Sequence, residues 1–382
     1  MIKFAWRRNL IYPLQLIIWH LSRNIETKLI SYLFNFSGSL TYTPLMFLGE
    51  FISGLLLFVY QNRFLKKKQV QKFLSLTLIY NQDFLSYPDS NEKIFFLIFC
   101  ITFFDWIQFL IWTVNVPKYL YISSSIVSRL SGILAISCAL LCYYTLRLQI
   151  FKHQIFSLII SGICAIIVII TEFFFQDINI FLTYADFIVV LFLAFLSQIL
   201  NAVLDTAEKY LFEINYVNPF FTLMFEGIFG FFLSFIFFAF PNYLDDIKTV
   251  YNTFSAGYLV LFSFLLLLYI ILSGGRNVFR VITTKLYSPT ARALTDYFLN
   301  PLYLIYDFSL RNDFLKQNER NIPYFIINLV ISIIISICGC VYNELLILFF
   351  CEFERDTHNQ VSERSATQNE LILINNILDD DN

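Results

Sequence analysis

The chain has 382 residues, of which 58% are hydrophobic and only 14% are charged, and its formal net charge is −2. Soluble globular domains carry about 25% charged residues, so this composition excludes an ordinary soluble domain. The apolar residues form blocks of roughly 20, the length at which a helix crosses about 30 Å of hydrocarbon, whereas a β-barrel would show alternating segments of about 10. We therefore predict an all-α, multispanning helical membrane protein that has the lipid bilayer as a partner.

Apolar blocks of span length follow one another along the chain. The strong blocks cover residues 40–61, 94–114, 119–145, 154–174, 184–204, 219–240, 256–275, 290–309 and 323–351. A further block, residues 9–22, is short and contains Pro13, Gln15 and His20, so it is either a weak first span or an interfacial helix. The sequence SGGRN at 273–277 is predicted to end the eighth span, because glycine often terminates helices.

The distribution of lysine and arginine predicts the orientation. If the chain has ten spans and a cytosolic N-terminus, most of the 26 basic residues fall in cytosolic segments, including the run RFLKKKQVQK. This bias follows the positive-inside rule, and without the first span Lys3, Arg7 and Arg8 would move to the opposite side. It predicts ten spans, with both termini in the cytosol.

The same pattern suggests three regions. Residues 1–39 form an N-terminal segment with the weak first span, and residues 40–351 form the membrane core. Residues 352–382 are polar and acidic and end in LDDDN, which predicts a disordered cytosolic tail. Two related halves, at about 9–174 and 184–351, would together make up the spans.

Similar sequences in corresponding spans support these two halves. The second span reads PLMFLGEFISG and the seventh reads TLMFEGIFGFF, so each places a glutamate, Glu50 or Glu226, beside a glycine within an apolar run. The fourth and ninth spans both open with Ser-rich sequence followed by an arginine, Arg129 or Arg292. Because five spans is an odd number, a second copy would enter the membrane inverted, and inverted repeats usually place the solute site near the midplane.

Charged residues inside the spans are the main functional candidates. A charge at the bilayer centre costs about 2.5–3.5 kcal/mol on insertion scales, so such side chains should face the bundle interior. Glu50, Glu226 and Asp105 are interpreted either as solute or proton sites or as groups that order helix packing. Glu208 and Lys209 are expected to mark the cytosolic end of the sixth span.

The sequence around Arg292 allows two interpretations. Arg292 and Asp296 lie four residues apart, on one face of a helix, so they form either an internal salt bridge or one wall of a polar site. Ser288 is predicted as the N-cap of that helix, with Pro289 in its first turn. Lys285, Arg292 and the positive end of the helix would together suit an anion. The alternative is a cytosolic loop followed by a structural pair.

The sequence motifs of common catalytic centres are not found. There is no GxSxG, Walker A or HExxH sequence and no His/Cys cluster. We therefore expect no enzymatic activity, no cofactor and no metal site, and no nucleic-acid partner. The seven cysteines lie in or at the end of apolar blocks, and we interpret them as small buried hydrophobic residues.

Several motifs occur in the order found in one family of transporters. They are MFLGEF, the Asp105 of the third span, EKY after the sixth span, FEGIFGF, Asn277 and KLYSPTARALTD. Over residues 40 to about 350 the chain resembles the drug/metabolite transporter superfamily, and most closely the F subgroup of the solute carrier 35 family of nucleotide-sugar-transporter-like proteins. This resemblance implies ten helices in two inverted five-helix repeats, a central cavity and alternating access without ATP. Relatives in that family exchange nucleotide-linked sugars for nucleoside monophosphates across Golgi or endoplasmic reticulum membranes.

The sequence thus favours a secondary transporter, working as an antiporter in an endomembrane of the Golgi, endoplasmic reticulum or lysosome. Its solute is expected to be polar and organic, with an anionic nucleotide-sugar-like compound or phosphorylated metabolite favoured. The candidate substrate-binding residues are Lys285, Arg292, Ser288, Asp296, Glu50, Glu226, Asp105 and Asn277.

Two other functions stay open. The chain could be a non-transporting scaffold or complex subunit that keeps the transporter fold. It could also be a proton-coupled exporter of lipophilic cations, in which Glu50 and Glu226 take the lead. A homodimer is also left open.

Overall fold

The computed structural model describes most of the apolar part of the chain. The described residues are 2–4, 10–34, 39–65, 91–111, 130–175, 184–236, 248–252, 258–302, 304–305, 321–348 and 357. Arg129 and the predicted tail at 352–382, apart from Thr357, lie outside them.

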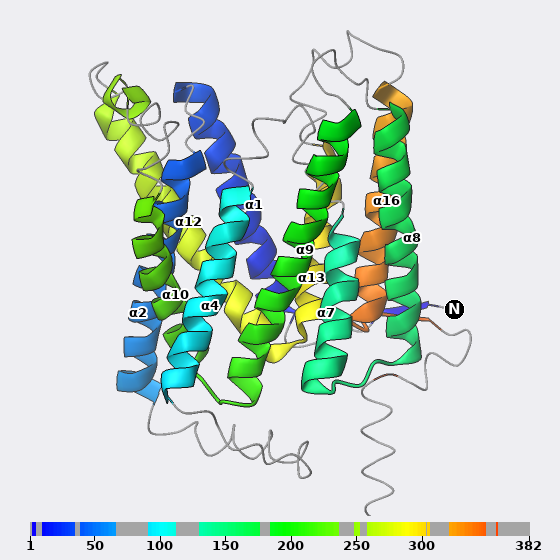
Figure 1. Ribbon diagram of the computed structural model, residues 1–382, viewed down its shortest axis with the longest axis horizontal. Helices are drawn as coiled ribbons and strands as arrows, with labels where there is room; N and C mark the ends of the chain where they lie inside the picture. The colour runs from blue at the N-terminus through cyan, green and yellow to red at the C-terminus, as the bar shows by residue number, and fades with distance from the viewer. Residues whose placement is uncertain are drawn as a thin grey trace, which may run out of the picture.

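The described residues are almost all helical, which confirms the all-α prediction (Figure 1). The helices are α1 (Ile11–Phe34), α2 (Ser39–Tyr60), α4 (Asn91–Leu110), α7 (Ser131–Leu146), α8 (Lys152–Phe175), α9 (Tyr184–Glu213), α10 (Pro219–Ser234), α12 (Leu259–Leu286), α13 (Pro289–Asp296) and α16 (Asn321–Tyr342). A π-helical turn, η1 (Gln61–Leu65), extends α2, and a 3-10 turn, η4 (Tyr297–Leu299), follows α13.

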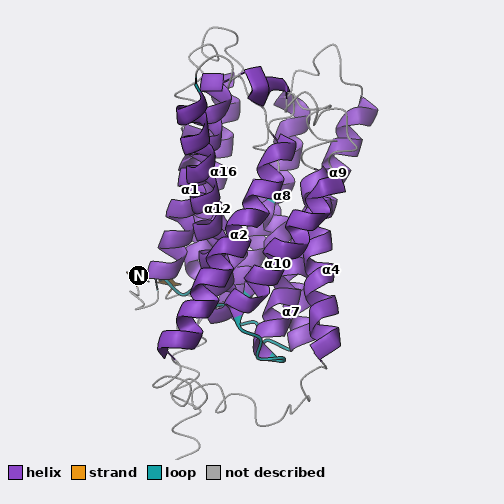
Figure 2. Ribbon diagram, turned by 90° about the vertical axis from the view of Figure 1, so that its left-hand side faces the viewer, coloured by secondary structure: helices purple, strands orange, loops and turns teal. Residues whose placement is uncertain are grey.

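Among the described residues, five helical segments are long and apolar enough to cross a membrane, so the chain is a multi-pass membrane protein. They are Thr41–Arg63, Lys152–Thr171, Leu191–Glu213, Leu259–Leu286 and Ile322–Tyr342. Two shorter helical segments, Gly132–Leu146 and Pro219–Ser234, are also apolar. The helices run roughly side by side along one direction, and this holds in the view turned by 90° (Figure 2).

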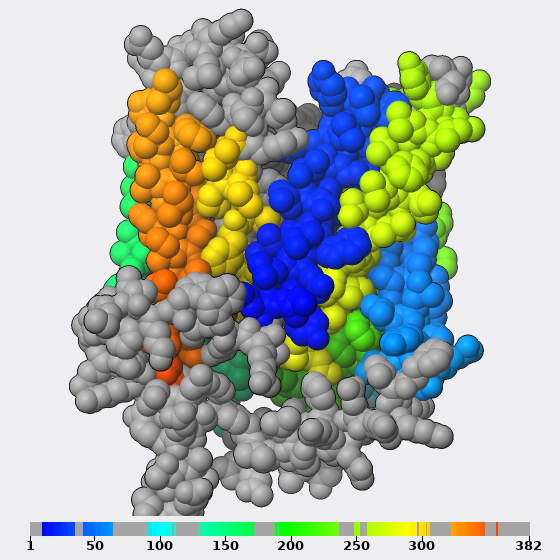
Figure 3. Space-filling view, turned by 180° about the vertical axis from the view of Figure 1, so that it is seen from behind, coloured from blue at the N-terminus to red at the C-terminus, as the bar shows by residue number. Residues whose placement is uncertain are grey.

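Two predicted boundaries are corrected by the structure. The weak block at 9–22 is only the first part of α1, which has 24 residues and also contains Arg23, Glu26 and Lys28, expected in a loop. Its buried residues, Leu16, Glu26 and Ile30, continue along one side of the helix, and α1 packs along α12. Figure 3 shows α1 (dark blue) lying across one face, with α16 (orange) on one side of it and α2 (lighter blue) on the other.

The second correction concerns the glycines at 273–277. They do not end a helix, because α12 continues through them to Leu286. A Cβ atom on Gly274 would lie 2.6 Å from the carbonyl oxygen of Gly49 in α2, so the glycine serves close helix packing instead. On the other side of α2, a Cβ on Gly227 of α10 would lie 2.3 Å from the backbone nitrogen of Phe51. The backbone of α2 therefore packs directly against the backbones of α12 and α10 at these glycines.

The helices form two groups that flank α9 (Figure 1). The α2 group consists of α1, α2, α4, α10 and α12, which pack mainly on one another. The α8 group consists of α7, α8, α13 and α16. Because α9 packs on α7 and also on α4 and α12, it connects the two groups.

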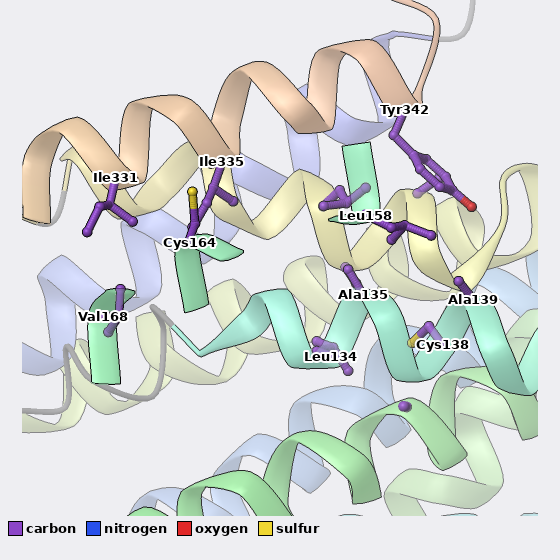
Figure 4. Close-up of a cluster of buried hydrophobic side chains, with 14 residues drawn as sticks. Leu134, Ala135, Cys138, Ala139, Leu158, Cys164, Val168, Ile331, Ile335 and Tyr342 are labelled. Atoms are coloured by element: carbon purple, nitrogen blue, oxygen red, sulfur yellow. The ribbon is translucent and has the colours of Figure 1, made fainter. Parts of the chain in front are cut away.

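The α8 group has a mostly apolar core (Figure 4). Leu134, Cys138 and Cys164 are buried there with Ile331 and Ile335, as expected for cysteines that act as small hydrophobic residues. The outer side of α8 exposes a row of isoleucines, as a surface facing lipid would: Ile155, Ile159, Ile163, Ile166, Ile167 and Ile170.

Two short strands pair with each other at one end of the bundle. Strand β1 (Ile2–Phe4) pairs antiparallel with β2 (Leu346–Leu348), with Ile2 opposite Leu348. Since β1 precedes α1 and β2 follows α16, the start of the first helix and the end of the last lie at the same end of the bundle.

Candidate functional site

Helix α9 carries a polar face into the interior of the bundle. Asp205, Glu208 and Lys209 are spaced three and four residues apart, which places them on one side of a helix. All three are buried, and α9 continues beyond them to Glu213. The span that contains them ends at Glu213, one turn beyond Lys209, so both residues lie near its end as predicted, and both also make contacts between helices.

Arg280 of α12 joins two glutamates from two other helices. Its Nη2 donates a hydrogen bond to Glu226 Oε2 of α10 over 2.9 Å. The same nitrogen lies 2.8 Å from Glu208 Oε1 of α9, an ion-pair distance without hydrogen-bond geometry. The Glu208 side chain is 0% exposed and that of Glu226 is 4% exposed. Arg280, expected in a cytosolic loop, is thus a buried partner of two carboxylates.

Glu50 of α2 lies beside this arrangement. Its Oε1 accepts a hydrogen bond of 2.5 Å from Asn277 Nδ2 of α12. The Oδ1 of Asn277 accepts in turn from Arg276, over 3.0 Å from Nε and 2.8 Å from Nη2. Asn277 therefore links Arg276 to Glu50 through a chain of hydrogen bonds. The close contact of Gly49 with Gly274 lies between the same two helices, α2 and α12.

We call Glu50, Glu208, Glu226, Asn277 and Arg280 the central cluster. The charges of Arg280, Asp105 and Glu208 all act on Glu50, and those of Glu208, Arg280, Glu50 and Asp105 act on Glu226. Three predicted residues, Glu50, Glu226 and Asn277, thus meet in one place. Asp105 of α4 is half-buried and lies close enough to interact with them.

A second buried pair joins α9 to α13. Arg292 Nη1 donates to Asp205 Oδ1, and both side chains are at most 10% exposed. The sequence offered a salt bridge between Arg292 and Asp296 as one interpretation. The partner that the structure gives to Arg292 comes instead from another helix, and the side chain of Asp296 lies outside the described part of the chain.

The start of α13 follows the predicted pattern. Ser288 Oγ accepts a hydrogen bond of 3.0 Å from the backbone N–H of Ala291, and Pro289 is the first residue of the helix. Because Arg292 already faces Asp205, the use of Lys285, Arg292 and this helix start as an anion site stays a prediction.

Lys209 of α9 forms hydrogen bonds with backbone carbonyls at the C-terminal end of α12. Its Nζ donates to the backbone carbonyls of Lys285, over 2.8 Å, and Tyr287, over 2.6 Å. It also lies 2.7 Å from Glu213 Oε1 one turn further along α9. The last carbonyls of a helix have no intrahelical donor, so a lysine from α9 supplies hydrogen bonds at this helix end. Lys285 itself is half-buried at that end.

Sequence reasoning missed Asp205, Glu208 and Arg280 as site residues. A signal for the first two was present, since the spacing of Asp205, Glu208 and Lys209 in an apolar helix predicts one polar face. Nothing in the sequence paired that face with Arg280, because its partners lie on separate helices. In the part of the chain that the structure describes, no group of three or more His, Cys, Asp or Glu side chains is arranged to hold a metal ion.

Comparisons with known proteins add no relative. No protein-family model matches the chain, and no curated protein matches it significantly. The resemblance to the solute carrier 35 family therefore rests on the motifs quoted above and stays a prediction.

Proposed function

We propose that this chain is a secondary transporter that moves a polar organic solute across an endomembrane by alternating access. The central cluster carries this proposal, because it buries three glutamates and an arginine from α2, α9, α10 and α12. Charged side chains inside a membrane bundle are costly and usually mark solute or ion pathways. A protein that needed only stability would gain as much or more from apolar packing at these positions.

The packing of the helices supports two related halves. If α1, α2, α4, α7 and α8 correspond to α9, α10, α12, α13 and α16, the contact of α1 with α12 corresponds to that of α9 with α4. In the same way, the contact of α2 with α12 corresponds to that of α10 with α4, and α7 with α8 to α13 with α16. Glu50 and Glu226 then lie on corresponding helices, as the similar sequences of these spans predict. Such halves are the usual framework of alternating access.

Converging arginines favour an anionic solute. The charges of Arg23, Arg276, Arg280 and Arg292, from α1, α12 and α13, all act on Asp105. Arg23 lies near the middle of α1, with its Nη1 3.7 Å from Met46 Sδ. Because Arg280 and Arg292 are bound to carboxylates, a nucleotide or phosphorylated metabolite would meet the guanidinium groups of Arg23 and Arg276 with its phosphate oxygens.

The excess of carboxylates supports a second candidate, a proton-coupled exporter of lipophilic cations. Glu208 and Glu226 share the buried guanidinium of Arg280, and the charge of Glu50 also acts on it. An acidic interior attracts cations and protons. The exporter would therefore depend on the buried glutamates, whereas a transporter of an anionic solute would depend on the arginines.

A thermal-shift screen of the purified protein in detergent separates these functions. The panel holds nucleotide sugars, nucleoside mono- and diphosphates, phosphorylated metabolites and lipophilic cations. A ligand at about 100 times its Kd stabilises the folded state by about 2.7 kcal/mol, which moves the melting temperature measurably. We expect a shift with one phosphate-bearing class, lost in Arg23→Gln and kept in Lys28→Gln, an exposed position on the same helix.

Other outcomes of the screen point elsewhere. A shift with cations alone, lost in Glu50→Gln, would favour the exporter. A panel without any shift, repeated in native membranes, would overturn transport and favour a scaffold. Uptake of the stabilising compound into proteoliposomes is the confirming measurement.

A further inference from the structure

We propose that Glu208 and Glu226 form a single proton-binding site across Arg280, and that its proton is exchanged during transport. This inference names the coupling ion of the proposed transporter and so rests on that function. Within the site, the two carboxyl groups share one proton, and the ionised member pairs with Arg280.

The geometry gives one cation to two acids. The same nitrogen of Arg280, Nη2, lies 2.8 Å from Glu208 Oε1 and 2.9 Å from Glu226 Oε2. One guanidinium offsets the charge of one carboxylate. The second carboxylate is buried among apolar helices, where an uncompensated charge is costly and a carboxyl group takes up a proton instead.

The surroundings of the pair add more acid than base. Glu50 on α2 and Asp105 on α4 act on Arg280 together with Glu208 and Glu226. Arg276 of α12 reaches Glu50 through Asn277, and Arg23 of α1 acts on Asp105. These two arginines and Arg280 are still outnumbered by the four acids Glu50, Asp105, Glu208 and Glu226, so they do not replace the proton.

Each acid of the pair keeps buried oxygens without a hydrogen bond. Both oxygens of Glu208, and Oε1 of Glu226, accept none from any residue that the structure describes. The two side chains are only 0% and 4% exposed. A proton shared by the two acids would remove the charge that Arg280 does not offset.

The proton would decide which helices are paired. A proton on Glu208 leaves Arg280 of α12 paired with Glu226 of α10, and a proton on Glu226 leaves it paired with Glu208 of α9. When the proton leaves, both carboxylates compete for the same guanidinium nitrogen. A protonation step is thereby converted into a choice between two interhelical ion pairs, which is the kind of two-state element that can couple an ion to a conformational change.

Infrared difference spectroscopy of the reconstituted protein at neutral pH tests the site directly. Wild type should show the carbonyl band of a buried protonated carboxyl group, shifted in D₂O. Glu208→Gln and Glu226→Gln should each abolish this band, because either remaining carboxylate can then pair with Arg280 alone. Arg280→Gln should strengthen it, and Glu213→Gln, which changes a partly exposed carboxyl group on the same helix, should leave it unchanged.

Two results would overturn the proton site. One is a band that survives in both Glu208→Gln and Glu226→Gln. The other is a wild-type spectrum without the band, combined with a rise in melting temperature on adding Na⁺ that Glu208→Gln abolishes, since the occupant would then be sodium. Using two isosteric variants keeps the test decisive if one of them does not fold.

Transport assays distinguish failure of this inference from failure of the proposed function. If the band behaves as expected but no solute crosses the membrane, the proton site stands and the transporter proposal fails. If a solute is transported and Glu208→Gln keeps the same dependence on an imposed pH gradient, the transporter stands and the proton inference fails.

Discussion

Helix α9 takes part in two buried charge clusters that differ in their balance. Asp205 faces Arg292 of α13, one acid with one base. Three residues later, Glu208 faces Arg280, which already holds Glu226. The same face of the same helix thus makes one balanced pair and one cluster with excess acid. The helices that pack against α9, and not α9 itself, decide which cluster can bind a further ligand.

The difference has an energetic meaning. A balanced buried pair is self-contained, and replacing both partners by apolar residues is often neutral or stabilising by about 1–4 kcal/mol. A cluster with excess acid is complete only when it holds another positive charge, such as a proton or part of a solute. We therefore interpret Asp205–Arg292 as structural and the central cluster as functional.

The largest expected effect is that of Arg280→Met. Removing the guanidinium leaves Glu208 and Glu226 without their shared cation, and breaking a buried pair costs about 3–5 kcal/mol. Unfolding in detergent, followed by heat or denaturant, should show a loss of this size. The triple variant Arg280→Met/Glu208→Gln/Glu226→Gln should recover most of the stability but not transport, and a triple variant that transports normally would contradict a functional role.

Arg292→Met should come next, because it strands one carboxylate, Asp205, instead of two. We expect a loss of about 3 kcal/mol in the same unfolding measurement. The double variant Asp205→Leu/Arg292→Met should regain wild-type stability and still move the solute. If the double variant stays folded and loses transport, this pair belongs to the functional site after all.

Lys209→Met tests the connection between α9 and the end of α12. It removes the charged hydrogen bonds to the carbonyls of Lys285 and Tyr287, and we expect a combined loss of about 1.5–3 kcal/mol. Hydrogen exchange should accelerate in the last turn of α12. The matched control is Glu213→Gln, which removes only the partly exposed partner of Lys209 and should change stability by about 0–1 kcal/mol. Equal effects of the two variants would show that the carbonyl contacts contribute little.

Gly274→Ala should have the smallest of these effects and compares packing in the two helix groups. Its Cβ would lie 2.6 Å from the backbone oxygen of Gly49, which cannot move without shifting α2. Overpacking of this kind costs about 1–3 kcal/mol. At Gly162 in the α8 group the nearest atom is Ile136 Cδ1, at 2.9 Å, the movable end of a side chain. Gly162→Ala should therefore be nearly neutral, and similar melting temperatures for the two variants would argue against close packing of α2 on α12.

The apolar helices could be predicted because their signal is local. The block at 40–61 became α2 (Ser39–Tyr60), and the block at 154–174 became α8 (Lys152–Phe175). An apolar run of about 20 residues forms a helix in a bilayer whatever its neighbours, since its backbone must satisfy its own hydrogen bonds. The predictions were wrong where polar residues interrupt the run, in α1 at Arg23 and in α12 at Arg276 and Arg280, because partners on other helices accommodate those residues.

The sequence by itself determined that this is an all-α membrane protein and that Glu50 and Glu226 are buried polar residues that need partners. Both follow from composition and from the cost of placing polar groups in hydrocarbon. Only the tertiary structure decided that Glu208 meets Glu226 at Arg280 while Asp205 takes Arg292. Which charges pair depends on which helices pack together, and close contacts between residues far apart in the chain, such as Gly49 with Gly274, fix that packing.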